Sequence, residues 1–593
     1  MLIRDSWYPF GVENVYDCDV AIIGGGPAGT TAGSLLRKYN PSLRVVILER
    51  EAFPREHVGE SQLPAISPIL NEIGVWDKVE AANFPIKIGA TYRWGNTKGY
   101  WKFDFLLRPF VDEPRPARFS QQRESTAFQV DRAVYDKILL DHARELGCEV
   151  FEQVKVDAID TEGDRVLGLS ISSQSSDIVA GTALEGITRI RARHYVDASG
   201  VSALLRKKME IDVSSPTNLR NIAIWDYWQN AEWAESIGTG GTRIQVLSLS
   251  WGWIWFIPIS PTRTSIGLVH PASKFKEHGK KPEEIYLEAV QSDARVSKLV
   301  AKATRERILQ STNDWSYISD RIVGENWFLA GDSCGFADPI LSAGMTLAHT
   351  SGRRIAYSIL ELDRGELDPA WIRSEYNQIH RDQILHHIRF ADFWYSSNGC
   401  FTDLKENCSE IAKHAGLELS AQEAFRWLST GGFAGEDLSF AMKGTYRFSS
   451  IKVFTETLTN GSIDWAITKK NEFRLNLSGA QLSEISVMRD GRIEPTKCYR
   501  RQSNILPLNG MYRIVYGAIS RESDALRAFS LMRQALITSR YPAIDEGMFA
   551  AYEVLESMIL EGWITAKYNK KRPVLSFSKD EPTDESAEPA AVM

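Results

Sequence analysis

Cysteine is scarce in this chain, and the cysteines that occur are not paired. Six are found in 593 residues, and none belongs to a C-x-x-C pair or to a spacing typical of metal ligands. They are Cys18, Cys148, Cys334, Cys400, Cys408 and Cys498. Neither a disulfide framework nor a metal centre is expected, and a reducing compartment is favoured.

Long apolar runs are also missing. No uninterrupted apolar stretch reaches the roughly 18 residues that a membrane-spanning helix requires. The first residues, Met1 to Trp7, lack the basic, apolar and small-residue regions of a signal peptide. The sequence therefore predicts a cytoplasmic protein that has no membrane partner.

Basic charge is not in excess either. The chain has 69 Lys and Arg against 76 Asp and Glu, a formal net charge of -7. Nucleic-acid binders usually carry a basic surplus, so nucleic acid is not expected as a partner. Apolar residues are plentiful, at 43% with 17 tryptophans. This composition is typical of an ordered protein, and the length predicts two or three structural units.

The N-terminal region contains a glycine motif between a strand and a helix. Asp19 to Ile23 reads as a short buried strand, and Gly24, Gly26 and Gly29 follow it. Glycines at this spacing permit a tight turn and a close approach to a pyrophosphate, which the helix N-terminus attracts. Glu49 closes a second apolar strand about twenty residues later, where a carboxylate holds the ribose of a dinucleotide. A turn that binds no nucleotide is the less favoured alternative.

Three further glycine sites lie along the chain. The loop Gly59-Glu60-Ser61 is a candidate to lie against a flat cofactor ring, although a plain strand-to-helix loop is the alternative. Asp197 to Gly200 ends a buried strand, and Gly331-Asp332 ends another. The motif at Gly24, the turn at Asp197 to Gly200 and Gly331-Asp332, arranged around the acid Glu49, together resemble the flavoprotein monooxygenase superfamily, in which the last aspartate meets the ribityl chain of FAD. The resemblance assigns cofactor binding to Gly24, Gly26, Ala28, Gly29, Glu49, Arg50, Arg55, Gly59, Glu60, Ser61, Arg132, Asp197, Gly200, Gly331, Asp332, Pro339 and Gly344.

The predicted fold class is α/β, and cofactor and sheet segments alternate along the chain. A Rossmann-like FAD-binding unit is expected from residues 15–86, 127–210 and 318–372. An antiparallel sheet unit is expected from 87–126 and 211–317. Residues 1–375 would form this module, which includes a helix over 345–362, and a further helix is expected over 372–393. Residues 376–577 would form a mixed, mainly helical C-terminal domain, and 578–593 a disordered tail.

Trp253-Ile254-Trp255-Phe256-Ile257-Pro258 is the most specific motif. It fits the W-x-W-x-I-P pattern of flavin-dependent halogenases, which the chain resembles over roughly residues 17 to 375. The resemblance implies that Trp253, Trp255, Ile257 and Pro258 form a barrier between flavin and substrate. Without it, an aromatic strand that fills a core would be the favoured interpretation.

Lys87 is the candidate catalytic residue, again by resemblance. Periodicity alone favours a strand lysine that points to solvent, but the family requires a lysine shortly after a G-E-S loop. Residues 336–344, F-A-D-P-I-L-S-A-G, resemble the segment that holds halide, so Ser342, Ala343 and Gly344 are the halide candidates. Consecutive amides at a helix N-terminus make an anion pocket. A turn that only supports the flavin is the alternative.

One departure narrows the substrate class. Tryptophan halogenases carry a glutamate immediately before the serine of the halide segment, whereas this chain has Leu341. The segment is more similar to that of phenol and pyrrole halogenases, including those that act on carrier-protein-tethered substrates. The resemblance implies FADH2 from a separate flavin reductase, O2, and chloride or bromide, which together form hypohalous acid.

Other functions stay open at this point. An aromatic hydroxylase or flavin-dependent reductase has the same fold, and a flavin-binding scaffold would need no chemistry. Phe390, Phe393, Trp394 and Tyr395 are candidates for the substrate wall or for core. Residues 549–577 resemble a winged helix, whose basic turn, Asn569 to Arg572, is expected to be a solvated hairpin tip rather than a nucleic-acid contact.

Overall fold

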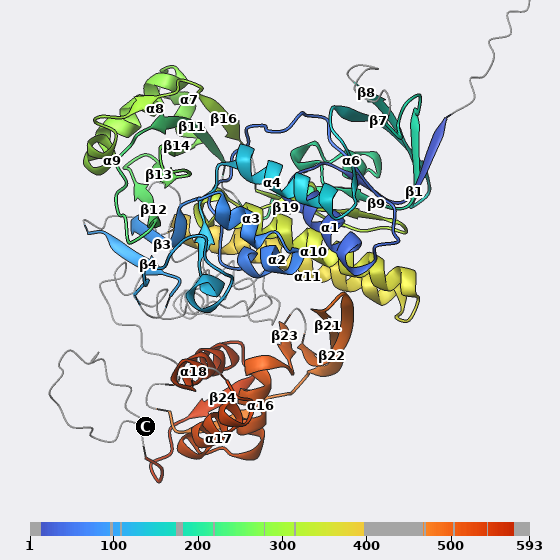
Figure 1. Cartoon of the computed structure of the whole chain (residues 1–593). Coiled ribbons are helices and arrows are strands. Elements are labelled where there is room, and N and C mark those ends of the chain that lie inside the picture. Colours follow the sequence, from blue (N-terminus) through green and yellow to red (C-terminus); the bar gives the residue numbers. More distant parts are fainter. Residues whose placement is uncertain are drawn as a thin grey trace, which may run out of the picture.

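The computed structural model describes residues 14–94, 99–106, 109–173, 182–217, 220–277, 279–313, 316–396, 467, 470–501, 504–541 and 544–573. Seven strands form the sheet that carries the glycine motif (Figure 1). Their order is β6-β2-β1-β9-β8-β7, with β18 also beside β9. The parallel strands are β1 (Val15–Ile23), β2 (Val45–Leu48), β6 (Glu149–Phe151), β9 (Arg189–Asp197) and β18 (Trp327–Leu329). The antiparallel ones are β7 (Val154–Glu162) and β8 (Arg165–Ser173).

Helices pack against this sheet and bring its motifs together. They are α1 (Pro27–Tyr39), α2 (Ile66–Ile73), α3 (Trp76–Ala81), α4 (Arg132–Glu145), α6 (Leu204–Lys208) and α10 (Ala343–Arg364). The helices α1 and α10 touch at their backbones, because a Cβ on Gly352 would lie only 2.3 Å from the Ala28 carbonyl oxygen. The first and last segments of the predicted cofactor unit are therefore in direct contact, as the interleaved arrangement requires.

A nine-stranded sheet forms the second layer (Figure 1). Its order is β15-β11-β14-β13-β12-β3-β4, with β16 beside β11 and β5 beside β3. The strands are β3 (Ile86–Arg93), β4 (Trp101–Asp104), β5 (Ala127–Phe128), β11 (Asn221–Gln229), β12 (Gly241–Ser248), β13 (Trp253–Pro258), β14 (Arg263–Pro271), β15 (Thr304–Arg305) and β16 (Gln310–Asn313). One pair differs from the antiparallel prediction, since β3 and β12 run parallel.

Strict alternation along β13 divides its side chains between two environments. Ile254 and Phe256 join an apolar cluster that includes Ile285 and Val296. These partners come from α8 (Pro282–Ser292) and α9 (Ala294–Leu299), which follow α7 (Ala272–Glu277). Trp253 and Trp255 therefore face the opposite side of the sheet. A small third sheet joins β10 (Val213–Ser214), β17 (Tyr317–Ser319) and β19 (Gly335–Phe336).

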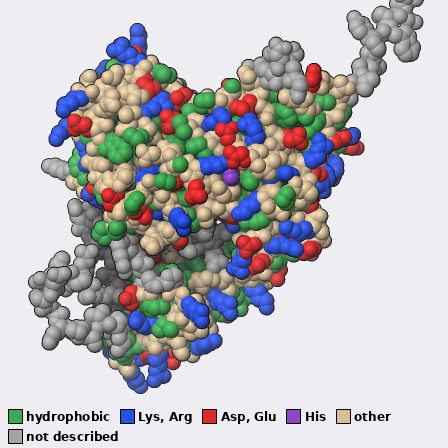
Figure 2. All heavy atoms as spheres, viewed as in Figure 1, with side chains coloured by type: hydrophobic (Ala, Val, Ile, Leu, Met, Phe, Trp, Pro, Cys, Tyr) green, Lys and Arg blue, Asp and Glu red, His purple; other side chains and the backbone are tan. Residues whose placement is uncertain are grey.

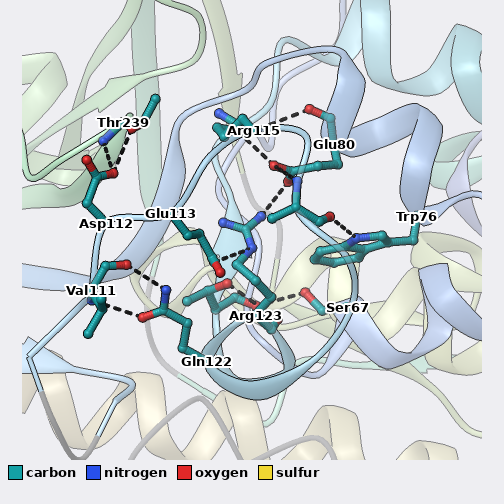
Figure 3. Close-up of polar contacts among 12 residues, drawn as sticks. Ser67, Trp76, Glu80, Val111, Asp112, Glu113, Arg115, Gln122, Arg123 and Thr239 are labelled. Atoms are coloured by element: carbon teal, nitrogen blue, oxygen red, sulfur yellow. Dashed lines mark hydrogen bonds and ion pairs between the residues drawn. The ribbon is translucent and has the colours of Figure 1, made fainter.

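A buried ion-pair cluster fastens the long connection between β4 and β5 to α3 (Figure 3). Glu80 pairs with Arg115 at 2.8 Å and also with Arg123, whose side chain is fully buried. The guanidinium of Arg123 lies 5.4 Å from the ring centroid of Trp76. Further along, Asp112 accepts hydrogen bonds from the amide and the hydroxyl of Thr239. The connection, which contains η1 (Gln121–Ser125), is thus anchored both to α3 and to the segment between β11 and β12 of the nine-stranded sheet.

The C-terminal region follows the long helix α11 (Pro369–Ser396) and mixes helices with strands (Figure 1). Its elements are β20 (Glu472–Leu475), β21 (Gln481–Arg489), β22 (Arg492–Arg501), β23 (Asn504–Pro507), α16 (Gly510–Arg521), α17 (Ala525–Thr538), α18 (Ile544–Leu560) and β24 (Ile564–Lys567). The β21–β22 hairpin docks on α11 through Glu375, which accepts from the Ser486 amide at 2.8 Å and pairs with Arg500 at 2.7 Å.

The C-terminal strand β24 pairs with β20, which precedes the helices in the chain. Residues 574–577 of the expected hairpin and the expected tail lie outside the described residues. The helix α18, which precedes β24, carries Asp545, Glu546, Glu553 and Glu556 and no Lys or Arg. Within the parts of the chain that the structure describes, no helix is both long and apolar enough to cross a bilayer.

Candidate active site

The glycine motif after β1 forms a turn that side chains would fill. Gly24 has φ +108°, and a Cβ there would lie 2.3 Å from the Ala198 carbonyl oxygen. A Cβ on Gly29 would lie 2.1 Å from the carbonyl oxygen of Gly24. Gly26 is the N-cap of α1 and makes no side-chain cap bond. The first amides of α1 therefore remain available at this turn, which fits a pyrophosphate.

Glu49 lies at the same turn, directly after β2. Its buried carboxylate accepts hydrogen bonds from the Gly25 amide at 2.8 Å and the Glu51 amide at 2.9 Å. This is the place expected of the residue that holds a ribose. Arg50 lies at the rim, where its exposed side chain pairs with Glu51 at 3.3 Å and reaches the Ser202 hydroxyl at 3.4 Å.

Arg132 shapes the Gly59 loop from the start of α4. Its guanidinium donates to the carbonyl oxygens of Val58 at 3.0 Å and Gly59 at 3.2 Å, and it forms a two-point ion pair with Asp136. Although burial opposes ionisation, the Arg132 charge lowers the pKa of Asp136. Gly59 has φ +101°, a conformation that favours glycine. Arg55 pairs with Asp136 at 3.5 Å.

The other members of the loop are buried between the two layers. Glu60 accepts a hydrogen bond from the hydroxyl of Tyr227, on β11, at 3.1 Å, and burial raises the pKa of its carboxyl. The backbones of Ser61 and Gln129 form an isolated antiparallel β-bridge. The loop is thus held by α4 through Arg132 and by the nine-stranded sheet through Tyr227, which fixes its position relative to that sheet.

The two later glycine turns meet the first at the ends of β9 and β18. Asp197 is fully buried and accepts from the amides of Ser199 at 3.0 Å and Leu205 at 2.7 Å, so it shapes the turn at Gly200. Gly331 begins η3 (Gly331–Ser333) with φ +58°, and its Cβ position is 3.4 Å from Ala28. Burial raises the pKa of Asp332 to about 6.

Lys87 points inward from β3, not into solvent. Its side chain is 1% exposed, and its amine donates to the Gln62 carbonyl oxygen at 2.9 Å and to the Ser342 hydroxyl at 3.3 Å. The solvent-facing reading from periodicity fails because nearly all of β3 is buried, and the pairing with β12 shifts register directly after Lys87. Burial lowers the pKa of the amine to about 7.

The predicted halide segment is the turn that opens α10. Asp338 caps η4 (Pro339–Leu341) by accepting from the Ile340 amide at 2.8 Å. Ser342 then adopts the left-handed conformation, and its amide donates to the Pro339 carbonyl oxygen at 3.1 Å. The next two amides belong to Ala343 and Gly344, in the first turn of α10, where helix amides lack a partner within the helix. These two amides and the Ser342 hydroxyl suit an anion.

The barrier motif occupies the whole of β13, and all its residues are buried, including Ile257 and Pro258. The two indoles lie next to each other, with ring centroids 6.0 Å apart. Trp255 fits only because Gly267 is opposite it, since a Cβ there would lie 2.1 Å from the indole. The Trp255 indole nitrogen donates to the Ser265 hydroxyl at 3.1 Å, and that of Trp253 to the Tyr395 hydroxyl at 2.9 Å.

The end of α11 contributes to the same region. Trp394 stacks on Tyr92 of β3, with ring centroids 4.6 Å apart, and Tyr395 contacts Trp253. The side chains of Phe390 and Phe393, the other two wall candidates, lie outside the described residues, as does that of Leu341. In the described parts of the chain no three His, Cys, Asp or Glu side chains gather as metal ligands would.

Comparisons with known proteins identify this arrangement. A model of the FAD binding domain matches residues 17–384. A tryptophan 2-halogenase of Chondromyces crocatus is 32% identical over 382 residues, which are 64% of this chain and 68% of the relative. The 1H-pyrrole-2-carbonyl-[peptidyl-carrier protein] chlorinase of Pseudomonas fluorescens is 30% identical, over 65% of this chain and 85% of that protein. The chain belongs to the flavin-dependent halogenases.

Solved structures agree with the fold of this halogenase. The flavin-dependent halogenase CmlS aligns with a TM-score of 0.69 at 24% identity, over 96% of this chain and 98% of that one. The myxobacterial chondrochloren halogenase CndH aligns with a TM-score of 0.58 at 25% identity, over 75% of this chain and 98% of that one. The alignment with CmlS extends the similarity in fold to the C-terminal region.

The halogenase uses FAD and halide, and its residues fit both. The turn at Gly24 and Gly29 leaves no room for side chains, and Glu49 lies beside it. The amides that open α10 suit an anion, and the hydroxyl of Ser342, the residue before them, accepts a hydrogen bond from the buried amine of Lys87. The family is thus supported by motif and by geometry.

Two positions that the sequence interpretation did not use also shape the site. Gly267 makes the space for Trp255, and a glycine inside an apolar strand could have indicated such a close approach. Tyr227 holds Glu60 from the neighbouring sheet. No sequence signal could have found this contact, because 167 residues separate the partners.

Proposed function

We propose that this halogenase acts on an electron-rich phenol or pyrrole, with Lys87 as the catalytic residue. The observation that carries the proposal is the position of the Lys87 amine, which is buried and lies 3.3 Å from the hydroxyl of Ser342. An arene of this kind is activated by its own hydroxyl or ring nitrogen. It therefore has less need of a protein carboxylate at position 341.

The chain's residues would divide the work between cofactor, halide and amine. When bound, FADH2 supplies two electrons and two protons, with which one O2, one halide ion and one further proton become hypohalous acid and water. The turns at Gly24, Glu49, Gly59, Gly200 and Asp332 would hold and orient it. Ala343 and Gly344 would hold the halide through their amides, with the Ser342 hydroxyl beside them.

Lys87 would receive the hypohalous acid. Its amine has two hydrogen-bond acceptors, Gln62 and Ser342, and burial alone accounts for the lowering of its pKa to about 7. As an ammonium it can polarise the halogen, and as a free amine it can carry the halogen. With the ammonium, the ring gives up a proton as the carbon–halogen bond forms, and the oxygen leaves as water. With the free amine, water leaves as the nitrogen–halogen bond forms, and the ring proton returns to the amine when the halogen passes to the ring.

The barrier supports halogenation over hydroxylation. Trp253 and Trp255 are each locked by a hydrogen bond from the indole nitrogen and are packed against each other. Two rigid indoles would keep the arene from the cofactor and let the smaller hypohalous acid pass. A hydroxylase of this fold would need direct contact between the arene and the cofactor.

We also propose two partners. The sequence contains no second dinucleotide fingerprint, so a separate flavin reductase would deliver the reduced FAD. The substrate would be carried by a carrier protein, as the name of the Pseudomonas fluorescens relative states for that enzyme. Residues 1–375 would form the catalytic module, and the region from 376 to 577 would recognise the carrier.

The excess of basic residues in the C-terminal region would favour a carrier protein with an acidic surface. In residues 470–573 Lys and Arg outnumber Asp and Glu, although the whole chain has a net charge of -7. Figure 2 shows Lys and Arg side chains over the lower part of the molecule, where this region lies. The exposed ones include Arg513, Arg521, Arg540, Lys567, Lys570 and Lys571.

The test is a halogenation assay with a flavin reductase, chloride or bromide, and free and carrier-bound phenols and pyrroles. The product mass should show the halogen isotope pattern. Lys87→Ala should bind FAD and consume O2 but form no halogenated product. A hydroxylated product that is independent of added halide would refute the proposal.

A further inference from the structure

A chain of hydrogen bonds joins the barrier to the halide turn. The indole nitrogen of Trp253 donates to the Tyr395 hydroxyl at 2.9 Å, and this hydroxyl donates to the Asp338 carboxylate at 3.0 Å. The same carboxylate oxygen accepts from the Ile340 amide at 2.8 Å. These hydrogen bonds thus start on β13, pass through the last turn of α11, and end in the turn before Ser342.

All the groups in this chain are buried. Tyr395 is 0% exposed, and Trp253 and Asp338 are each 1% exposed. Burial raises the pKa of the Tyr395 hydroxyl well above its ordinary value, so it stays protonated and donates. In a buried network each bond is stronger than in water, and the loss of one partner costs more.

Aromatic contacts hold Tyr395 in place between the two elements. Trp94, which follows β3, lies at 6.1 Å from the Tyr395 ring and at 6.2 Å from the Trp253 ring, both as edge-to-face pairs. The Trp94 indole nitrogen donates to the backbone oxygen of Trp394, the residue before Tyr395. The hydroxyl therefore has little freedom to leave its two partners.

We infer that Tyr395 is a positioning residue, which fixes the halide turn relative to the tryptophan barrier. This inference rests on the proposed roles of Ser342 to Gly344 and of Trp253. Asp338 caps the turn through the Ile340 amide, two residues before Ser342. An Asp338 carboxylate that is held by Tyr395 keeps the following amides in the orientation that binds halide. Without the hydroxyl, the carboxylate can rotate and the turn loosens.

The test uses full-length, FAD-loaded protein and bromide binding measured by titration calorimetry. Tyr395→Phe should weaken bromide binding about tenfold, the usual effect of losing one buried hydrogen bond to a charged group. In the halogenation assay the KM for halide should rise in parallel, while kcat at saturating halide stays within about threefold, since Lys87 is untouched.

The sheet provides a matched control. The Trp228 indole nitrogen donates to the Tyr286 hydroxyl at 2.8 Å, and that hydroxyl donates to the Ile266 carbonyl oxygen at 3.1 Å. Tyr286→Phe breaks the same type of buried chain in the α8 cluster, away from the halide turn. It should leave the bromide affinity and the halide KM unchanged.

Substitutions at Asp338 test the same chain from its other end. Asp338→Asn keeps an oxygen that can accept from Ile340 and Tyr395, so its bromide affinity should stay within about threefold of wild type. Asp338→Ala should weaken bromide binding, and adding Tyr395→Phe to this variant should weaken it no further. If Tyr395→Phe does not retain FAD, the Asn and Ala variants test whether the Asp338 end of the network holds the halide turn, and wild-type bromide affinity in Asp338→Ala would then overturn the inference.

Bromide binding by Tyr395→Phe with wild-type affinity, or effects of Asp338→Ala and Tyr395→Phe that simply add, would overturn the inference. A wild-type enzyme that halogenates no arene would instead refute the proposed function. The bromide titrations do not depend on that result, so the two failures can be told apart.

Discussion

Replacing Lys87 with methionine should change how the stability of the enzyme depends on pH. The amine is 1% exposed, and burial lowers its pKa from 10.5 to about 7. Between these two values the unfolded chain binds the proton and the folded chain does not. Wild-type stability therefore rises with pH across this window, and Lys87→Met removes that contribution.

The expected size follows from the two pKa values. At pH 7 the folded amine is half protonated, while at pH 9 it is neutral and the unfolded amine remains mostly charged. Linkage then gives a gain of about 2 kcal/mol in wild-type stability between pH 7 and pH 9. Lys87→Met also removes the hydrogen bond to Gln62, which costs about 1–3 kcal/mol at every pH. Only the pH-dependent difference is diagnostic.

The measurement is urea unfolding followed by tryptophan fluorescence, at about pH 7 and about pH 9. The free energy of unfolding of wild type minus that of Lys87→Met should increase by about 2 kcal/mol from the lower to the higher pH. Lys302→Met is the control, because the Lys302 side chain is 85% exposed. A difference that is the same at both pH values would refute the burial of a titrating amine at this site.

Two further predictions concern close packing at glycines, and a third concerns a buried ion-pair cluster. Gly267→Ala would place a Cβ 2.1 Å from the Trp255 indole and should lower the halogenated product formed per O2 consumed, with FAD still bound; an unchanged yield would contradict the fitted barrier. Gly29→Ala meets backbone at 2.1 Å and should weaken FAD binding by more than about tenfold in a fluorescence titration. Gly517→Ala is the control, because its Cβ would meet only open space, and it should leave FAD binding unchanged. Glu80→Gln breaks a buried ion-pair cluster and should cost about 3 kcal/mol or more, seen as a lower melting temperature; an equal melting temperature would contradict it.

The sequence predicted the parts of this protein that depend on local pattern. The strand, turn and helix around Gly24 follow from apolar residues, glycines and a proline within a few positions of each other. The long helices after Ala343 and Pro369 follow from their periodicity. The barrier motif could be identified because six consecutive residues carry it. These features need little knowledge of the rest of the chain.

Other features were decided by contacts between distant segments. Periodicity suggested that Lys87 faces water, yet β12, β5 and the turn at Ser342 surround it, 255 residues away in the case of Ser342. Tyr395 could equally have been core or substrate wall until α11 brought it between Trp253 and Asp338. The amino-acid sequence by itself determined which chemical groups are present and what each could do chemically. Only tertiary packing decided which of them meet and whether water is excluded, because burial and proximity depend on residues hundreds of positions apart.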